Sequence, residues 1–158
     1  RAAFRYETPL DRLLPRLKFH NDLAAGRLLG GLMAEALAGA ERPYALIPLP
    51  LRRRRLRSRG FDQSLELATP LAHHLRLPLL DGVLIRVRET APQSRLDAPA
   101  RRRNLRRAFA VRTGPTLPPH IVLIDDVMTT GATLHAAAAA LLLAGATRVD
   151  AWVCARVA

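Results

Sequence analysis

Apolar residues recur along the chain with two different periods, and these periods predict strands that alternate with helices. Residues 121–124 form a short apolar run with three β-branched members, which is typical of a buried strand. Residues 134–144 are alanine, leucine and one histidine, which favours a helix that Gly145 ends. Further strands are expected at 44–47, 79–86, 108–111 and 147–155, and further helices at 10–19, 22–37, 61–75 and 101–107.

This alternation predicts an α/β fold with a mainly parallel twisted sheet and helices on both of its faces. The chain of 158 residues suffices for one domain with a real core, so residues 1–158 are predicted to form a single domain. Pro15 is expected to break the first helix and Pro70 to kink the third. Ligands of such folds bind where strands end, so the loops after Ile47 and Ile124 are the expected site.

Composition narrows the class of protein. The chain is 49% hydrophobic and 24% charged, which is typical of a soluble globular domain. No apolar run is long enough to span a membrane, and the first residues lack the apolar core of a signal peptide. Cys154 is the only cysteine, which excludes an intramolecular disulfide and a cysteine-rich zinc site. We expect it to be a buried strand residue, and a cytoplasmic location fits the lack of disulfides.

The net charge of +12 comes from arginine, since Lys18 is the only lysine. Arginines cluster at 52–59 and 101–107, and such clusters commonly contact the phosphates of a small ligand or of nucleic acid. The ordinary alternative is a solvated basic surface. Lysine offers a compact point charge where arginine offers a flat fork, so a single lysine among 24 arginines suggests a contact that arginine would fit badly.

The stretch at 121–133 carries the clearest chemistry in the chain. Asp125 and Asp126 follow the apolar strand, and a small, hydroxyl-rich loop around Gly131 leads into the helix. The free N–H groups and the positive dipole end of a helix N-terminus suit a phosphate group. Two acids beside that anion make sense if they accept hydrogen bonds from sugar hydroxyls or help to hold a metal ion. The ordinary alternative is a helix that Thr133 caps.

This stretch closely resembles the loop that binds phosphoribosyl pyrophosphate in type I phosphoribosyltransferases, and it matches neither a P-loop nor a Rossmann fingerprint. Further segments resemble the competence protein F (ComF) family in that family's order. They are 17–19, 47–50, 59–63, 86–93, and Arg103-Asn104 before Ala108-Phe109. The family often has Asn where Asp62 stands, and its members often carry a four-cysteine metal module ahead of this region, which these 158 residues do not contain.

The resemblance implies a type I phosphoribosyltransferase-like fold in which residues 1–40 form a small, helical N-terminal hood over the site. It also implies binding of phosphoribosyl pyrophosphate with Mg²⁺ and, in bacterial relatives, a link to DNA uptake. The resemblance does not establish a reaction; the expected one is transfer of phosphoribose with release of pyrophosphate. Asp125 and Asp126 would act as the catalytic acids and help to hold Mg²⁺, in part through water. The implied ligand-binding residues are Thr129, Thr130, Gly131, Ala132 and Thr133 for the ribose 5-phosphate, and Pro48, Leu49, Lys18, Arg52, Arg59, Gln93 and Arg103 for the pyrophosphate and the closing loop at 88–104.

Three functions remain open at this point. The chain is expected to be a transferase of phosphoribose to a base or amine, a sensor that binds the same ligand without turnover, or a competence factor that binds single-stranded DNA or the competence machinery. The acidic pair and the phosphate loop favour the first two. The arginine clusters allow the third, while only 4% aromatic residues argues against a stacking platform for single strands.

Overall fold

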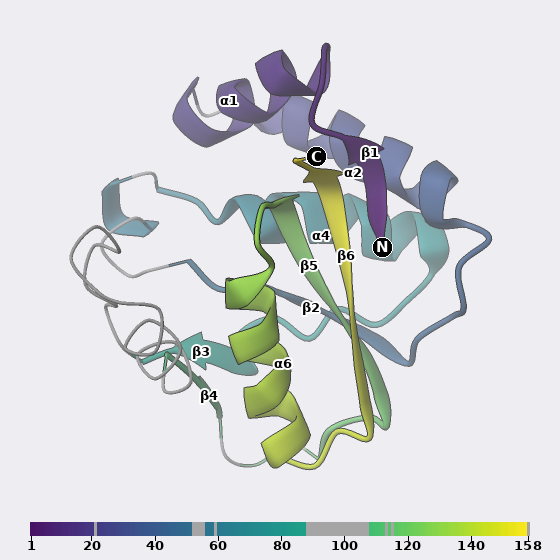
Figure 1. Cartoon of the computed structure of the whole chain (residues 1–158), viewed down its shortest axis with the longest axis vertical. Coiled ribbons are helices and arrows are strands. Elements are labelled where there is room, and N and C mark those ends of the chain that lie inside the picture. Colours follow the sequence, from purple (N-terminus) through teal and green to yellow (C-terminus); the bar gives the residue numbers. More distant parts are fainter. Residues whose placement is uncertain are drawn as a thin grey trace.

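Four parallel strands form the main sheet of the protein. The structure is a computed structural model, and it describes residues 1–20, 22–51, 56–58, 60–87, 108–112, 114 and 116–157. The strands lie in the order β1-β6-β5-β2, and a separate antiparallel pair joins β3 to β4 (Figure 1). Their bounds are Ala2–Arg5 (β1), Ala45–Pro48 (β2), Leu84–Arg86 (β3), Phe109–Val111 (β4), His120–Met128 (β5) and Arg148–Arg156 (β6).

Helices cover both faces of this sheet. The described helices with assigned bounds are α1 (Leu10–His20), α2 (Leu23–Leu37), α4 (Gln63–Leu75) and α6 (Ala132–Leu143). Figure 1 shows α6 lying across one face, while α2 and α4 run behind the other and α1 sits above the ends of β5 and β6. The predicted α/β class, with a mainly parallel sheet between helices, is therefore confirmed.

Alternate residues of the central strand feed two hydrophobic cores. Val122 and Ile124 join the core under α1, α2 and α4, whereas Ile121 and Leu123 join the core under α6. All four side chains are at most 1% exposed. A strand that is buried on both faces has no polar alternation to show, which explains why residues 121–124 form an unbroken apolar run. Cys154 on β6 is fully buried, as the sequence predicted.

Several expected boundaries were wrong. Helix α1 continues through Pro15, because Leu14 and Leu17 are fully buried on either side of it and packing holds the helix together. Strand β1 had no sequence signal, since three of its residues are only partly buried and Arg5 is exposed. Pairing with β6 makes it a strand. The strand expected at 79–86 is split: Leu79 forms an isolated parallel bridge with Leu46 of β2, whereas β3 pairs with β4 and not with the main sheet. The helix predicted at 101–107 lies outside the described residues.

Helices α2 and α4 cross very closely at Gly30. A Cβ atom there would lie 2.3 Å from Cγ of Pro70 and 2.7 Å from the carbonyl oxygen of Leu67. The neighbouring Gly31 has open surroundings, since the nearest atoms to its Cβ position are those of the His74 ring at 3.9 Å. The absence of a side chain at Gly30 therefore sets the distance between the two helices.

We expect Gly30→Ala to destabilise the protein by about 1–3 kcal/mol, because the helices must separate to admit one methyl group. Gly31→Ala is the matched control on the same helix, and it should raise stability by roughly 0.5–1 kcal/mol through helix propensity alone. Thermal or urea unfolding of both variants measures the difference. Equal stability of the two variants would contradict the close crossing.

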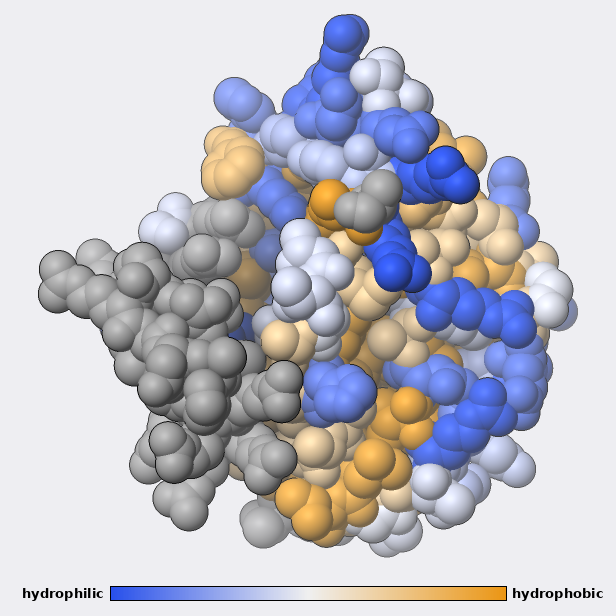
Figure 2. All heavy atoms as spheres, viewed as in Figure 1, coloured by the Kyte–Doolittle hydropathy of each residue, from blue (hydrophilic) through white to orange (hydrophobic). Residues whose placement is uncertain are grey.

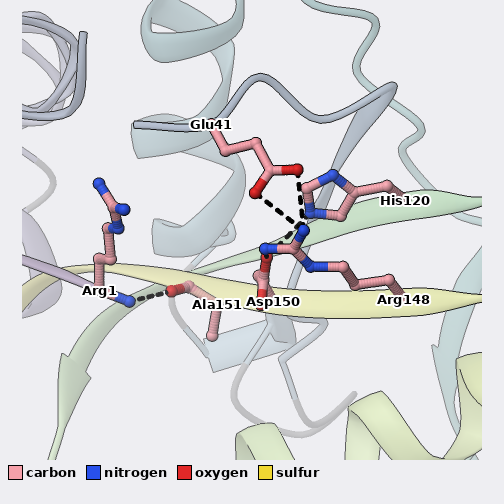
Figure 3. Close-up of polar contacts among 6 residues, drawn as sticks. All are labelled: Arg1, Glu41, His120, Arg148, Asp150 and Ala151. Carbon is pink, nitrogen blue, oxygen red and sulfur yellow. Dashed lines mark hydrogen bonds and ion pairs between the residues drawn. The ribbon is translucent and has the colours of Figure 1, made fainter. Parts of the chain in front are cut away.

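A network of charged side chains braces the end of the sheet where β5 and β6 begin (Figure 3). One guanidinium nitrogen of Arg148 lies 2.8 Å from each carboxylate oxygen of Glu41, and the other lies 2.7 Å from Asp150. His120 Nε2 lies 2.9 Å from the same Asp150 oxygen. Burial acts to raise the pKa of Asp150, but hydrogen bonds from His120 and Arg148 outweigh it and hold that pKa below its usual value. This end of the sheet is thereby tied to the loop before β2.

The outer surface of α6 is unusually apolar for a helix on one side of a sheet. Leu142 is 47% exposed and Leu143 is 89% exposed. Figure 2 shows apolar surface gathered over the lower end of this helix, bordered by hydrophilic residues on the β6 side. Among the described residues, none of the helices combines the length and the apolar character needed to cross a membrane.

Candidate ligand site

A cavity of about 810 Å³ opens where β2 and β5 end, at the carboxyl edge of the main sheet. It lies between the last turn of α1, the segment after β2, the first turn of α4 and the end of β5. The structure therefore brings together residues that are more than 100 positions apart. Of the site residues predicted from the sequence, those that line this cavity are Lys18, Leu49, Asp125, Asp126 and Thr133.

Asp126 is the more deeply buried of the two acids. It is 5% exposed, and its Oδ2 atom lies 3.0 Å from Nζ of Lys18. Its other oxygen accepts a hydrogen bond from the backbone N–H of Val127. Lys18 comes from the last turn of α1, so this ion pair ties the N-terminal helices to the floor of the cavity. The single lysine thus contacts a carboxylate and also lines the cavity.

Asp125 has a different environment. Its Oδ1 atom accepts hydrogen bonds from Ser64 Oγ at 3.2 Å and from the backbone N–H of Asp126 at 2.9 Å. Burial and, next, the negative charge of Asp126 raise the pKa of Asp125 to about 7, against these hydrogen bonds and the more distant charge of Lys18. A carboxyl group with this pKa exchanges its proton near neutral pH, which is a property of groups in functional sites.

Both acids lie within β5, whereas the sequence pattern had placed them just after the end of the strand. The strand continues to Met128, and Asp125 pairs with Val153 on β6. Strand geometry therefore holds the backbone of both acids rigidly. The sequence pattern placed the end of the strand too early because it followed the apolar run, whereas the hydrogen bonds to β6 decide where the strand ends.

The loop after β5 has the backbone geometry expected of an anion site. Gly131 is the N-cap of α6 with φ of 72°, a left-handed conformation that favours glycine, and no side chain caps the helix. The alternative in which Thr133 caps the helix is therefore wrong. The Thr130 hydroxyl accepts a hydrogen bond from Ala132 N at 3.4 Å. Since the first N–H groups of a helix need partners, the start of α6 can receive an anion.

This loop divides two cavities. Thr133 lines the cavity that contains the two acids. Thr130, Gly131 and Ala132 line a second hollow of about 550 Å³ between α6 and β6, and Thr129 is exposed. Of the five loop residues predicted to hold one phosphate, Thr133 is thus the one that shares a cavity with the acids.

The segment after β2 uses its own N–H groups internally. Leu49 N donates to the carbonyl oxygen of Ile124 at 2.9 Å, and Leu51 N donates to Asp62 at 2.9 Å. Pro48 and Pro50 have no N–H to offer. The backbone N–H groups of Leu49 and Leu51 are therefore already used within the protein, and residues 52–55, which follow them, lie outside the described residues. Leu49 contributes its position beside the cavity instead.

Asp62 fixes the positions of two backbone segments that line the cavity, at Leu51 and at Ser64. Its carboxylate accepts from Leu51 N, from Ser64 N at 2.9 Å and from Leu65 N at 3.4 Å, so it caps α4 and fixes the preceding loop. Burial raises the pKa of Asp62, although these hydrogen bonds lower it. Asp62, at the position where the sequence resemblance favours Asn, therefore uses its carboxylate to fix the backbone around it.

Sequence reasoning missed several residues of the site, and Ser64 and Arg86 are the two with the clearest polar roles. Ser64 is 1% exposed and holds Asp125, and Arg86 at the end of β3 lines the cavity with its guanidinium 5.1 Å from the centre of the Phe109 ring. The sequence contained a signal for each of them, since Ser64 lies just after an Asp that can cap a helix and Arg86 lies at the end of an apolar strand. Arg52, Arg59, Gln93, Arg103 and the predicted closing loop at 88–104 lie outside the described residues.

The two carboxylates of the site suit Mg²⁺ only when a ligand and water supply the remaining oxygen atoms. Among the residues that the structure describes, nowhere do three or more His, Cys, Asp or Glu side chains gather as a complete metal site. Asp125 and Asp126 supply hard carboxylate oxygens, and Mg²⁺ is commonly held by one or two carboxylates together with substrate phosphates and water. The residues present therefore fit a magnesium ion that arrives with a phosphorylated ligand.

Comparison with known proteins finds relatives along nearly the whole chain, although no family model matches. DNA utilization protein YhgH of Salmonella typhimurium is 41% identical over 153 residues, which cover 93% of this chain and 67% of that protein. Competence protein F of Haemophilus influenzae is 35% identical, covering 96% and 69%. Competence protein ComFC of Streptococcus pneumoniae is 30% identical, covering 92% and 63%. The crystal structure of TT1426 from Thermus thermophilus aligns with a TM-score of 0.48 at 20% identity, covering 81% of this chain and 72% of that one.

Proposed function

Because the chain belongs to the competence protein F (ComF) family, we propose that it binds phosphoribosyl pyrophosphate with Mg²⁺ in the cavity at the end of β5. It would then transfer the phosphoribosyl group to a base or a base-like amine and release pyrophosphate. The observation that carries this proposal is the pair Asp125 and Asp126 held within a rigid strand, followed at once by the uncapped N-terminus of α6.

Groups in the cavity, together with the loop that borders it, match each part of the ligand. The 5-phosphate fits the start of α6, where Gly131 lets the backbone approach and Thr133 adds a hydroxyl group. The ribose hydroxyls fit the carboxylate oxygens of Asp125 and Asp126. Lys18 can contact a pyrophosphate oxygen from its place beside Asp126, because its flexible stem carries a compact charge.

The transfer itself exchanges one bond for another at the anomeric carbon. The C1–O bond to pyrophosphate breaks, pyrophosphate keeps the electron pair, and the acceptor nitrogen forms a bond to C1 and loses a proton. Positive charge develops on the sugar, as in glycoside hydrolysis, and the nearby carboxylates stabilise it. When bound, Mg²⁺ would neutralise charge on the departing pyrophosphate. Asp125, with a pKa of about 7, can exchange a proton in this setting.

Calorimetric titration with phosphoribosyl pyrophosphate, with and without Mg²⁺, tests the binding step. A screen of nucleobases and amines for pyrophosphate release then tests the transfer. We expect saturable binding that Mg²⁺ strengthens, and release with at least one acceptor. Binding without release would favour a sensor, and absence of binding in a folded sample would refute the proposal.

Single-stranded DNA is the second candidate ligand, favoured by relatives that are named for competence and DNA utilization and by the net charge of +12. We expect weak binding that is independent of sequence and nearly vanishes at physiological salt, because a chain this basic attracts any polyanion. If the arginine clusters follow a DNA backbone instead, the log–log salt slope is about 0.7 per phosphate contact.

The arginine clusters can be tested by neutralising Arg53, Arg54 and Arg102 together. If all three contact phosphates, the salt slope should fall by roughly two units for three lost contacts. Excess phosphoribosyl pyrophosphate with Mg²⁺ displaces the DNA if the two ligands share a site. Tight DNA binding at physiological salt that this ligand leaves unchanged would instead favour the competence-factor function.

A further inference from the structure

Phe19 presents an aromatic ring at the mouth of the candidate ligand site. It lies in the last turn of α1 and is 68% exposed, and it lines the same cavity as Asp125 and Asp126. The chain has seven Phe, Tyr and Trp residues, all within the described part, and only Phe19 and Tyr44 are exposed. Of the residues that line this cavity, Phe19 is the only aromatic one in the described part of the chain.

The position of Phe19 is fixed by its neighbours along the chain. Leu17 is fully buried in the core, and Lys18 is held to Asp126 by the 3.0 Å ion pair. These two anchors hold the last turn of α1 against the end of β5, so the residue that follows them is kept at the cavity. An exposed phenyl ring there gains free energy when a flat apolar surface covers it.

The cavity also has room for more than the sugar phosphate. Its volume of about 810 Å³ lies within the range of sites that enclose a whole drug-sized ligand. The polar groups Asp125, Asp126 and Thr133 gather at the end of β5 and the start of α6, whereas Phe19 belongs to α1. Lys18 also lines the cavity from α1, so this helix brings both a cation and an aromatic ring to it.

From this arrangement we infer that Phe19 is a stacking surface for the planar ring of a nucleobase whose sugar phosphate occupies the site at the end of β5. The inference rests on the proposed function and adds the chemical class of the acceptor, an aromatic heterocycle. Stacking on a phenyl ring tolerates any base, because every base has a π-face, so Phe19 selects flat rings over aliphatic amines without choosing among bases. The base can belong to a mononucleotide or to single-stranded DNA.

The test compares ribose 5-phosphate with the four nucleoside 5′-monophosphates by calorimetry. In the wild-type protein the base should improve affinity about 10-fold or more over the sugar phosphate alone, as expected for one stacked base. Phe19→Ala should remove this gain and leave the affinity for ribose 5-phosphate unchanged, whereas Phe19→Tyr should keep it. Tyr44→Ala is the matched control, since Tyr44 is 64% exposed and precedes β2 at the opposite end of that strand from the cavity.

Two further measurements separate this inference from the proposed function. NMR of the Phe19 ring protons should show upfield shifts when a nucleoside is added, even if sugar phosphates fail to bind and the proposed function falls. If Phe19→Ala weakens binding of a single-stranded oligonucleotide and leaves binding of the mononucleotides unchanged, the ring stacks on DNA bases. Two results would overturn the inference. One is a Phe19→Ala variant in which the base still improves affinity as in the wild type. The other is a Phe19 ring whose NMR signals do not shift with base, nucleoside, nucleotide or oligonucleotide.

Discussion

Replacing Gly131 with valine is expected to abolish binding of phosphoribosyl pyrophosphate while the protein stays folded. The variant puts a branched side chain on the N-cap residue of α6, next to the first N–H groups where the phosphate is proposed to bind. Losing two charge-assisted hydrogen bonds of about 1.5–3 kcal/mol each weakens binding by roughly 100-fold or more. The fold should survive, because a Cβ atom at Gly131 has its nearest contact at 3.6 Å, with Sδ of Met128.

The Gly131 variant also carries backbone strain, and Gly145 supplies the control for it. Both glycines have positive φ, 72° for Gly131 and 109° for Gly145, and Gly145 follows the other end of α6. Each valine should cost about 1–3 kcal/mol of stability. Calorimetry should then find ligand binding lost in Gly131→Val and retained in Gly145→Val. Full affinity in a folded Gly131→Val protein would refute the phosphate site.

Asp125→Asn is expected to stabilise the ligand-free protein at pH 8 and to have little effect near pH 4. The pKa of Asp125 is raised from 3.8 to about 7 on folding, so folding favours the neutral form of this group. The loss of folding stability caused by the ionised Asp125 is absent below the unfolded pKa, grows between about pH 4 and 7, and is complete above pH 7. Each pKa unit corresponds to about 1.4 kcal/mol, so the gain at pH 8 is on the order of 2–4 kcal/mol.

Melting temperatures measured from pH 4 to 8 check this expectation, with Glu35→Gln as the control. Glu35 is an exposed carboxylate on α2, and its replacement should leave the pH profile of stability almost unchanged. The amide oxygen introduced by Asp125→Asn can still accept the hydrogen bonds from Ser64 and Asp126, so packing is preserved. A melting temperature of Asp125→Asn that follows the wild type at every pH would show that the Asp125 carboxyl is not perturbed.

Asp126→Asn should behave in the opposite way. It removes the partner of Lys18, and an unpaired charge left in a partly buried position is destabilising. We expect a loss of about 1–3 kcal/mol at neutral pH, and a lower pKa for Asp125, because the charge of Asp126 is the second cause of its rise. Both single variants should weaken ligand binding if the two carboxylates contact the ribose.

The sequence by itself determined the fold class and the central motif of the protein. An unbroken apolar run at 121–124 is typical of a strand buried on both faces, and two acids followed by a glycine loop and a helix predicted a ligand site after that strand. Such local features can be predicted from the sequence because strand burial, glycine backbone freedom and helix propensity act over a few neighbouring residues.

Only the tertiary structure decided which distant side chains complete the site. The pairing of Lys18 with Asp126, the support of Asp125 by Ser64 and the presence of Phe19 at the cavity depend on how α1 and α4 pack against β5. The same packing gives two adjacent aspartates different roles, with one ion-paired and the other holding a pKa of about 7. Desolvation and contacts between elements more than 50 residues apart cause these differences, and no local sequence pattern contains them.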